Sequence, residues 1–311
     1  MKKSILKNIS IICAICLIIF TAGGFTSSSG VSPASDTSVS SEATNTDITV
    51  GVTDDAPVAP VASGSVPMFI NGIRMTDGIK VEDTTYVPLR AFFDVVGDQT
   101  DIAWDSETNT VTATGKDLEL SATVGKKYMT VNDRCFYLPY GVLVLDNALC
   151  LPVRELAKVY QLEVNWDTDN SAVSLSADDP SLLENGKTYY NEEDLYWLSR
   201  LINAEAGNQP FDGKVGVGDV VMNRVADPTC PKSIYGVIFD SKYGVQFSVT
   251  ENGGIYEEPN EESVIAAKIC LEGYDVVGDS IYFVNPKVGV SAWFAQTRVF
   301  VMNIGEHDFY A

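Results

Sequence analysis

A central helix is predicted by Leu195-Tyr-Trp-Leu-Ser-Arg-Leu-Ile-Asn-Ala-Glu-Ala-Gly207, in which apolar residues recur at helical spacing. Asn191 is placed to cap this helix, and Gly207 is placed to end it. Glu205 falls in the last turn, beside the apolar face, where the negative end of the helix dipole favours a protonated carboxyl group. If it also faces a partly apolar cleft, Glu205 is a candidate general acid near neutral pH. The alternative is an exposed or salt-bridged glutamate, which is the usual state of a helical Glu.

The sequence after this helix predicts a domain that runs to the last residue. A second helix is expected over 213–224, where Gly216 and Gly218 permit close packing, and a third over 261–271, capped by Asn260. Strands are expected over 281–284 and from 297 to 302. The predicted class of residues 190–311 is therefore α+β with helices dominant.

An internal repeat precedes this domain, over residues 66–177. Its two copies share a Pro-Leu/Val-Arg segment, Tyr86-Val-Pro-Leu-Arg90 and Cys150-Leu-Pro-Val-Arg154, followed by an apolar helical run and a Trp-Asp pair at Trp104 and Trp166. Each copy predicts an extended segment, a helix and a two-stranded hairpin. We expect a duplicated strand–helix–hairpin domain of α+β class, with both tryptophans in its core rather than on its surface as sugar platforms. Residues 178–189 are the expected connector.

The first 65 residues have the composition of a targeting segment and a linker. Lys2, Lys3 and Lys7 precede an almost wholly apolar run over 9–20, so residues 1–25 are predicted to be a signal peptide. The alternative is an uncleaved N-terminal anchor. Residues 26–65 are rich in Ser, Thr, Ala and Pro and contain no aromatic residue, which is typical of a flexible linker. We expect export, with no stable membrane insertion after signal removal.

Charge and histidine content narrow the function classes. The formal net charge of −21 argues against nucleic acid and against an anionic membrane surface as partners. His307 is the only histidine, which excludes zinc hydrolases that need two or three imidazoles, and no Gly-x-Ser-x-Gly elbow is present. Neither a metal nor a cofactor is expected. Carboxylate chemistry remains, and it suits the cleavage of glycosidic bonds.

Four cysteines follow the signal segment: Cys135, Cys150, Cys230 and Cys270. Two interpretations stay open. Outside the cell, Cys135–Cys150 and Cys230–Cys270 could each form a bridge within one domain, or all four could be buried free thiols.

The repeat resembles the copper-amine-oxidase N-terminal-like domain through its paired Pro-Leu/Val-Arg and Trp-Asp signatures. The resemblance covers nearly all of residues 66–177 and implies a binding or spacing module of exported proteins. It does not imply copper here, because copper sites require several imidazoles and this chain has one histidine.

Residues 190–311 resemble the SleB-type cell-wall hydrolase family. The resemblance rests on these segments, in family order: 201–210, 213–225, 235–239, 246–248, 282–286, Trp293 and 304–310. It implies a helix-rich, lysozyme-like catalytic domain that cleaves peptidoglycan glycan strands, often in the spore cortex, with Glu205 as the single catalytic glutamate. One departure is that Gly207-Asn208 stands where many members have Arg-Gly.

The resemblance also implies a reaction, lytic transglycosylation between N-acetylmuramic acid and N-acetylglucosamine. Glu205 would protonate the linking oxygen and then take a proton from the muramyl 6-hydroxyl, which attacks C1. A muramidase with two carboxylates is the alternative, with Asp212 or Glu251 as the second carboxylate. A non-catalytic wall-binding or germination scaffold is the other alternative.

Other matched positions are candidates for contacts with the substrate. Gln246, Ser248 and Asn285 could hydrogen-bond the sugars, and Tyr282 and Trp293 could form stacking walls. For Arg224 the choice lies between the lactyl carboxylate and a structural ion pair. The expected partner is the peptidoglycan glycan strand, and an accessory germination protein is a further candidate partner.

Overall fold

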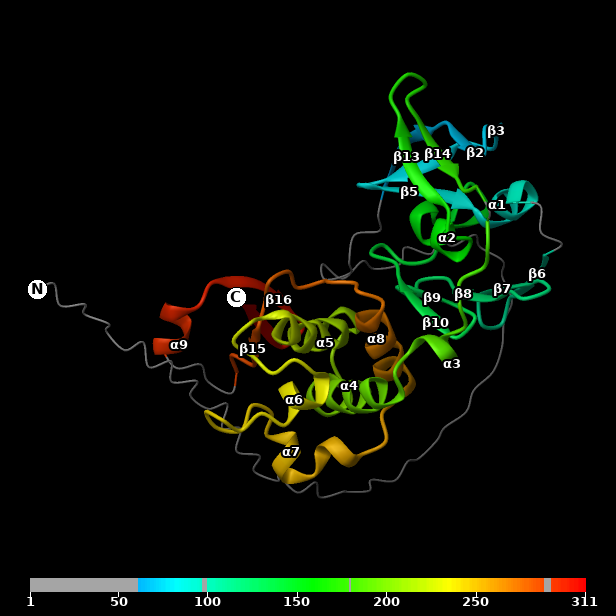
Figure 1. The fold of residues 1–311 in the computed structure, drawn as a ribbon. Helices are drawn as coiled ribbons and strands as arrows, with labels where there is room; N and C mark the ends of the chain where they lie inside the picture. The colour runs from blue at the N-terminus through cyan, green and yellow to red at the C-terminus, as the bar shows by residue number, and fades with distance from the viewer. Residues whose placement is uncertain (1–60, 97–99, 179, 288–291) are drawn as a thin grey trace, which may run out of the picture.

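The computed structural model describes residues 61–96, 100–178, 180–287 and 292–311, without the side chains of Ala292, Trp293 and Ala295. Figure 1 shows an upper, strand-rich N-terminal domain and a lower C-terminal domain built around helices. The predicted signal peptide and most of the predicted linker lie outside the described residues. Strand β1 (Ala62–Val66) nevertheless falls in the last residues expected to be linker, and it pairs antiparallel with β4. No described helix is long and apolar enough to cross a membrane.

The described part of the N-terminal domain contains three sheets. The first has the strand order β1, β4 (Gly78–Val81), β5 (Thr84–Pro88), β12 (Ala148–Pro152), β11 (Leu143–Leu145). The second has the order β10 (Arg134–Tyr137), β9 (Tyr128–Val131), β8 (Glu119–Thr123), β7 (Thr110–Thr114), β6 (Asp101–Asp105). The third has the order β13 (Glu163–Asp167), β14 (Ala172–Ser176), β2 (Met68–Ile70), β3 (Ile73–Arg74).

Both Pro-Leu/Val-Arg segments lie where a strand runs into a helix. Strand β5 leads into α1 (Leu89–Val96) and β12 into α2 (Val153–Val159), and the two strands pair antiparallel with Leu151 opposite Val87. The hairpins β6–β7 and β13–β14 follow. Their turns begin with an aspartate that accepts a backbone N–H two residues later, as expected for Asp in a turn.

The two tryptophans of the repeat are not core residues, and that prediction was wrong. Trp104 is 51% exposed and Trp166 is 57% exposed. They lie on β6 and β13, each at the edge of its sheet, opposite Val111 and Val173. The alternation of a hairpin sequence identifies one face of a strand, but it does not say whether a second layer covers that face.

The C-terminal domain has three mutually packed helices, α4 (Glu192–Ala206), α5 (Phe211–Ala226) and α8 (Glu261–Leu271). The short helices are α3 (Gly186–Tyr189), α6 (Ile234–Ile238), α7 (Val249–Asn252), η1 (Gly254–Tyr256) and α9 (Ala292–Thr297). A sheet of order β15 (Tyr282–Val284), β17 (His307–Tyr310), β16 (Phe300–Ile304) completes the domain (Figure 1). The strand expected from 297 therefore begins three residues later, after α9.

The predicted caps and close contacts of these helices are confirmed. The Asn191 side chain accepts the backbone N–H of Glu193 at 2.9 Å, and Asn260 caps α8 in the same way. Helix α4 ends at Ala206, with Gly207 as its cap residue. A Cβ on Gly218 would lie 2.5 Å from the Cys270 sulfur, so only glycine lets α5 approach α8 this closely.

The two domains share a buried and charged interface. Cys135 and Tyr137 of β10 belong to the same hydrophobic cluster as α4, α5 and α8. Arg134 Nε donates to Glu272 Oε1 at 2.7 Å, and Tyr190 Oη donates to the same oxygen at 2.6 Å. Further contacts across the interface are Lys126–Glu262, Lys127–Asp212, Lys268–Asp133 and the ring pair Tyr128–Phe211. The N-terminal domain is therefore packed against the helical core of its neighbour.

All four described cysteines are free thiols, so neither of the two possible bridges is formed. Cys135 lies in the interdomain cluster, whereas Cys150 lies in a separate cluster with Val81 and Tyr86. Cys270 is fully enclosed between α5 and α8, and Cys230 is half-buried. The interpretation as free thiols is the one that the structure supports.

Candidate active site

Glu205 is a half-buried carboxyl group in the last turn of α4. It follows Leu198 and Leu201, both fully buried, on the same side of the helix. Neither a hydrogen bond nor an ion pair joins its carboxyl group to any residue in the described part of the chain. Burial alone raises the pKa of Glu205 to about 7. Near neutral pH the group can therefore both give and accept a proton.

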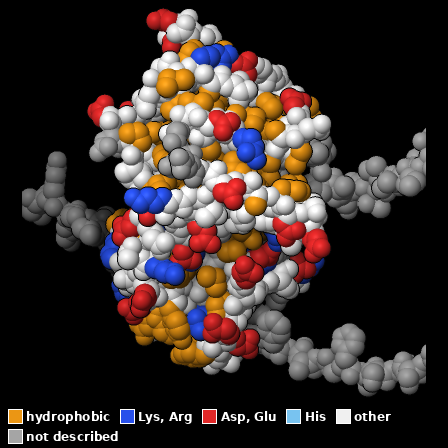
Figure 2. Space-filling view, turned by 90° about the vertical axis from the view of Figure 1, so that its right-hand side faces the viewer, with side chains coloured by type: hydrophobic (Ala, Val, Ile, Leu, Met, Phe, Trp, Pro, Cys, Tyr) orange, Lys and Arg blue, Asp and Glu red, His pale blue; other side chains and the backbone are white. Residues whose placement is uncertain are grey.

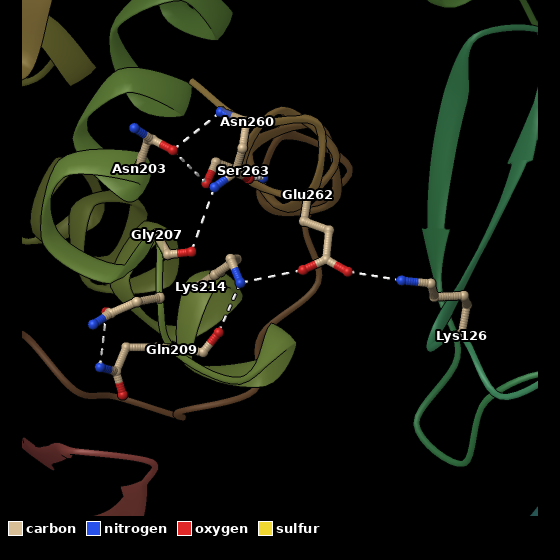
Figure 3. A network of polar contacts seen from close by, with 9 residues as sticks. Lys126, Asn203, Gly207, Gln209, Lys214, Asn260, Glu262 and Ser263 are labelled. Atoms are coloured by element: carbon tan, nitrogen blue, oxygen red, sulfur yellow. Dashed lines mark hydrogen bonds and ion pairs between the residues drawn. The ribbon is translucent and has the colours of Figure 1, made fainter. Parts of the chain in front are cut away.

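Residues on either side of Glu205 are hydrogen-bonded to Asn260, the residue that caps helix α8. Asn203 Oδ1 accepts the backbone N–H of Asn260 at 3.0 Å, and the Gly207 carbonyl accepts the Asn260 amide at 3.4 Å (Figure 3). These contacts hold the last turn of α4 from both sides. The carboxyl group between them is thus held in place by its neighbours in the chain, with no hydrogen bond or ion pair to it among the described residues.

A chain of charges extends from the segment after Glu205 to the N-terminal domain. The buried Lys214 donates to the Gln209 carbonyl at 2.7 Å and pairs with Glu262 at 3.2 Å. Glu262 in turn pairs with Lys126 at 2.8 Å, and Figure 3 shows the carboxylate between the two lysines. None of these residues was predicted from the sequence. The sequence held one signal for Lys214. It is the only charged residue in the run 213–218 of glycine and valine, and a helical segment with so few polar residues is expected to be buried.

Gln209 also ties the end of α4 to the turn between β16 and β17. Its side-chain oxygen accepts the Glu306 backbone N–H at 2.9 Å. The Glu306 carboxylate accepts Lys287 at 2.8 Å and Asn285 Nδ2 at 3.4 Å. Asn285, one of the residues predicted to bind sugar, is thus connected through Glu306 to Gln209 in the segment that follows Glu205.

A second group of predicted residues gathers around Arg224, near the end of α5. Its Nε donates to the Ile281 carbonyl at 2.7 Å, and its guanidinium carbon lies 5.2 Å from the Phe247 ring and 5.5 Å from the Tyr282 ring. Gln246 and Ser248 flank Phe247 in the chain. Arg224 therefore holds the 246–248 segment and β15 together.

The other residues predicted to contact the substrate are placed as follows. Gln246 Nε2 donates to the Gly244 carbonyl at 2.9 Å, and Ser248 precedes α7 without capping it by its side chain. The Tyr282 hydroxyl accepts Arg298 at 3.2 Å. Trp293 belongs to α9, but its side chain lies outside the described residues.

The two candidates for a second carboxylate are placed differently. Asp212 accepts the Tyr137 hydroxyl at 3.0 Å and pairs with Lys127, so its carboxylate is part of the domain interface. Glu251 is exposed on α7. His307 is buried, its ring centroid 5.1 Å from that of Phe283, and burial lowers its pKa. It is therefore a neutral packing residue near pH 7.

The described residues contain no group of three or more His, Cys, Asp or Glu side chains placed to hold a metal ion. The N-terminal domain has no histidine, and its two cysteines lie in different clusters. These donors do not fit copper.

The similarity to known proteins follows the division into domains. A family model described as Cell Wall Hydrolase matches residues 208–310. Residues 208–310 form a cell wall hydrolase domain. A second model, Copper amine oxidase N-terminal domain, matches residues 69–175. Glu205 lies just before the first residue of the hydrolase match.

Curated relatives match over 120 residues. The spore cortex-lytic enzyme of Bacillus cereus is 32% identical, over 39% of this chain and 45% of that protein. The spore cortex-lytic enzyme of Bacillus subtilis is 31% identical, over 39% of this chain and 38% of that protein. The match thus spans less than half the length of these relatives. Among solved structures, the catalytic domain of the germination-specific lytic transglycosylase SleB from Bacillus anthracis is 31% identical, covering 42% of this chain and all of that chain, with a TM-score of 0.36.

Proposed function

We propose that this protein is an exported peptidoglycan lytic transglycosylase in which Glu205 is the general acid and base. The observation that carries the proposal is the half-buried carboxyl group without a partner, with a pKa raised to about 7. The cell wall hydrolase domain supplies the substrate class, and relatives that are spore cortex-lytic enzymes favour the cortex as the site of action.

The proposed reaction needs one carboxyl group. Protonated Glu205 gives its proton to the oxygen between N-acetylmuramic acid and N-acetylglucosamine as the bond from C1 to that oxygen breaks. The carboxylate then takes the proton of the muramyl 6-hydroxyl as its oxygen bonds to C1. The acid is regenerated, no water is consumed, and the muramyl end becomes a 1,6-anhydro ring. The nucleophile belongs to the substrate, so proximity replaces a second catalytic side chain.

The muramidase alternative requires a second carboxylate near Glu205. Asp212 is engaged by Lys127 and Tyr137, and Glu251 projects from the surface of another helix. The engagement of Asp212 in the domain interface favours the single-carboxyl reaction.

The remaining roles are proposals of the same kind. Gln246, Ser248 and Asn285 bind sugar hydroxyl and acetamido groups, while Tyr282 and Trp293 stack on sugar rings. Arg224 acts mainly as a positioning residue, because it holds the 246–248 segment against β15. The duplicated N-terminal domain, carried on a linker after a signal peptide, acts as a spacing or binding module of the enzyme in the wall.

The test compares purified wild-type protein with three variants on insoluble spore cortex and on vegetative peptidoglycan. Glu205→Gln should release at least a hundredfold less soluble muropeptide, the loss expected when a general acid is removed. Asp212→Asn and Glu251→Gln should retain cleavage, and both are matched controls because each also replaces a carboxylate by its amide. A wild-type protein that releases nothing would favour the non-catalytic scaffold. Equal activity of Glu205→Gln would exclude the proposed mechanism.

A further inference from the structure

Five aromatic side chains meet on the outer side of the C-terminal domain. Trp197 of α4 is the centre, and its ring centroid lies 4.9 Å from Tyr196, 5.6 Å from Tyr235, 5.0 Å from Phe239 and 6.2 Å from Tyr256. The rings come from α4, from α6 and the residue after it, and from η1. We call this cluster the aromatic platform.

The platform is open to solvent, although aromatic rings usually contribute to a core. Tyr196 is 43% exposed, Tyr235 is 46% exposed and Tyr256 is 61% exposed, while Trp197 below them is half-buried. Three exposed tyrosines around one tryptophan form a contiguous apolar area with hydroxyl groups on it. Contiguous areas of this kind mark binding sites more often than isolated surface rings do.

The one cation in contact with the platform, among the described residues, is paired with a carboxylate. Arg200 lies over the Tyr196 ring at 3.8 Å and pairs with Glu258 at 2.6 Å. Glu192, Glu193 and Glu257 lie close in the chain to the platform residues, and acidic side chains are spread over the face of the molecule that Figure 2 shows. Such surroundings disfavour a polyanion or an anionic membrane and favour an uncharged ligand.

We propose that the aromatic platform is a second glycan-binding site, which holds an uncharged stretch of polysaccharide strand away from the cleaved bond. A pyranose ring has an apolar face of C–H groups that fits an aromatic ring, and hydroxyl groups at its edge that fit tyrosine. An aliphatic protein partner would favour Leu, Ile or Met on the surface. Within the described C-terminal domain the large exposed apolar side chains are aromatic, with Val299 as the exception.

The position of the platform suits a strand that also enters the active site. Trp197 and Glu205 belong to the same helix, eight residues apart, so they are separated by about 12 Å along its axis and about 80° around it. A long glycan could therefore contact both. The identity of the glycan as peptidoglycan rests on the proposed function, whereas binding to the platform does not require cleavage.

The test measures binding in the Glu205→Gln background, so that no strand is cut. Insoluble chitin, an uncharged polymer of N-acetylglucosamine, is pelleted with the protein, and the bound fraction is measured against chitin concentration. Tyr235→Ala with Tyr256→Ala should weaken binding about tenfold, as expected for the loss of aromatic anchors. Phe300→Ala, which removes a 54% exposed ring from β16 outside the platform, should leave the affinity unchanged.

Two measurements distinguish a loss of glycan contacts from a loss of folding. Tyr256→Ala alone changes the most exposed ring, so it should weaken binding without lowering the unfolding midpoint even if the double variant is less stable. In the active protein, the double variant should slow the digestion of insoluble sacculi but not of short soluble fragments, which are too short to span both sites.

The proposal is overturned if the double variant binds chitin as well as its parent does, or if Phe300→Ala lowers the affinity as much. It is also overturned if the protein forms a concentration-dependent dimer that the double variant loses, with no change in glycan binding, because the platform would then bind a second copy. If the wild-type protein binds glycan but cleaves none, the proposed function is contradicted, whereas the proposal that the platform binds glycan is not.

Discussion

Replacing Glu205 by Gln should change how folding stability depends on pH. Burial raises the pKa of Glu205 to about 7, against an ordinary value of 4.5. The folded protein therefore binds this proton more tightly than the unfolded chain does. Below about pH 4.5 the group is protonated in both states. As pH rises from there towards 7, only the unfolded chain loses the proton, so the folded state loses stability.

The magnitude follows from the difference between the two pKa values. One pKa unit corresponds to about 1.4 kcal/mol, so ionisable Glu205 costs up to about 3 kcal/mol of unfolding free energy above pH 7. Glu205→Gln removes this cost. The unfolding free energy of the variant minus that of wild type should therefore rise by about 3 kcal/mol between pH 4 and pH 8.

Urea unfolding followed by tryptophan fluorescence measures this difference at each pH. Asp219, whose pKa burial also raises to about 7, is present in both proteins and cancels. Glu251→Gln is the control, since it also replaces a carboxylate by its amide, but at an exposed position. A Glu205→Gln difference that stays flat, or that falls as pH rises, would show that the folded protein does not bind the Glu205 proton more tightly than the unfolded chain.

Three further predictions concern the packing around the site. Arg134→Ala should lower the unfolding free energy by about 3 kcal/mol in urea melts, because it leaves the buried Glu272 carboxylate without its guanidinium partner; a loss below 1 kcal/mol would contradict a buried interface. Gly218→Ala should destabilise the protein by about 2 kcal/mol in thermal unfolding, since its Cβ would meet the Cys270 sulfur; an unchanged melting temperature would mean that the helices are less tightly packed. Iodoacetamide should modify Cys230 faster than the other described cysteines in the native protein, because burial raises the pKa of those thiols, and mass spectrometry of peptides would reveal any early modification elsewhere.

The features that could be predicted from sequence are those with a local physical cause. Asn191 and Asn260 were recognisable as caps because a short polar side chain before an apolar helical run satisfies free backbone N–H groups. Gly218 was recognisable as a packing residue because it interrupts a helix with a side chain too small to fill space. Glu205 could be placed beside the buried face from helical spacing alone.

The features that were missed depend on contacts between distant parts of the chain. No local pattern pairs Arg134 with Glu272, or places Lys214 between Gln209 and Glu262, because each contact joins segments that only the folded chain brings together. Trp104 was assigned to the core for the same reason, since hairpin alternation does not reveal an uncovered sheet edge. The aromatic platform likewise comes from three separate segments.

The choice of nucleophile is tested most directly by the mass of the new muramyl ends when cortex peptidoglycan is digested in isotopically labelled water. If Glu205 serves both proton transfers and the 6-hydroxyl is the nucleophile, the ends carry a 1,6-anhydro ring and no label from the solvent. Reducing ends that contain labelled oxygen would mean that water is the nucleophile, and would contradict a reaction that needs only one carboxyl group.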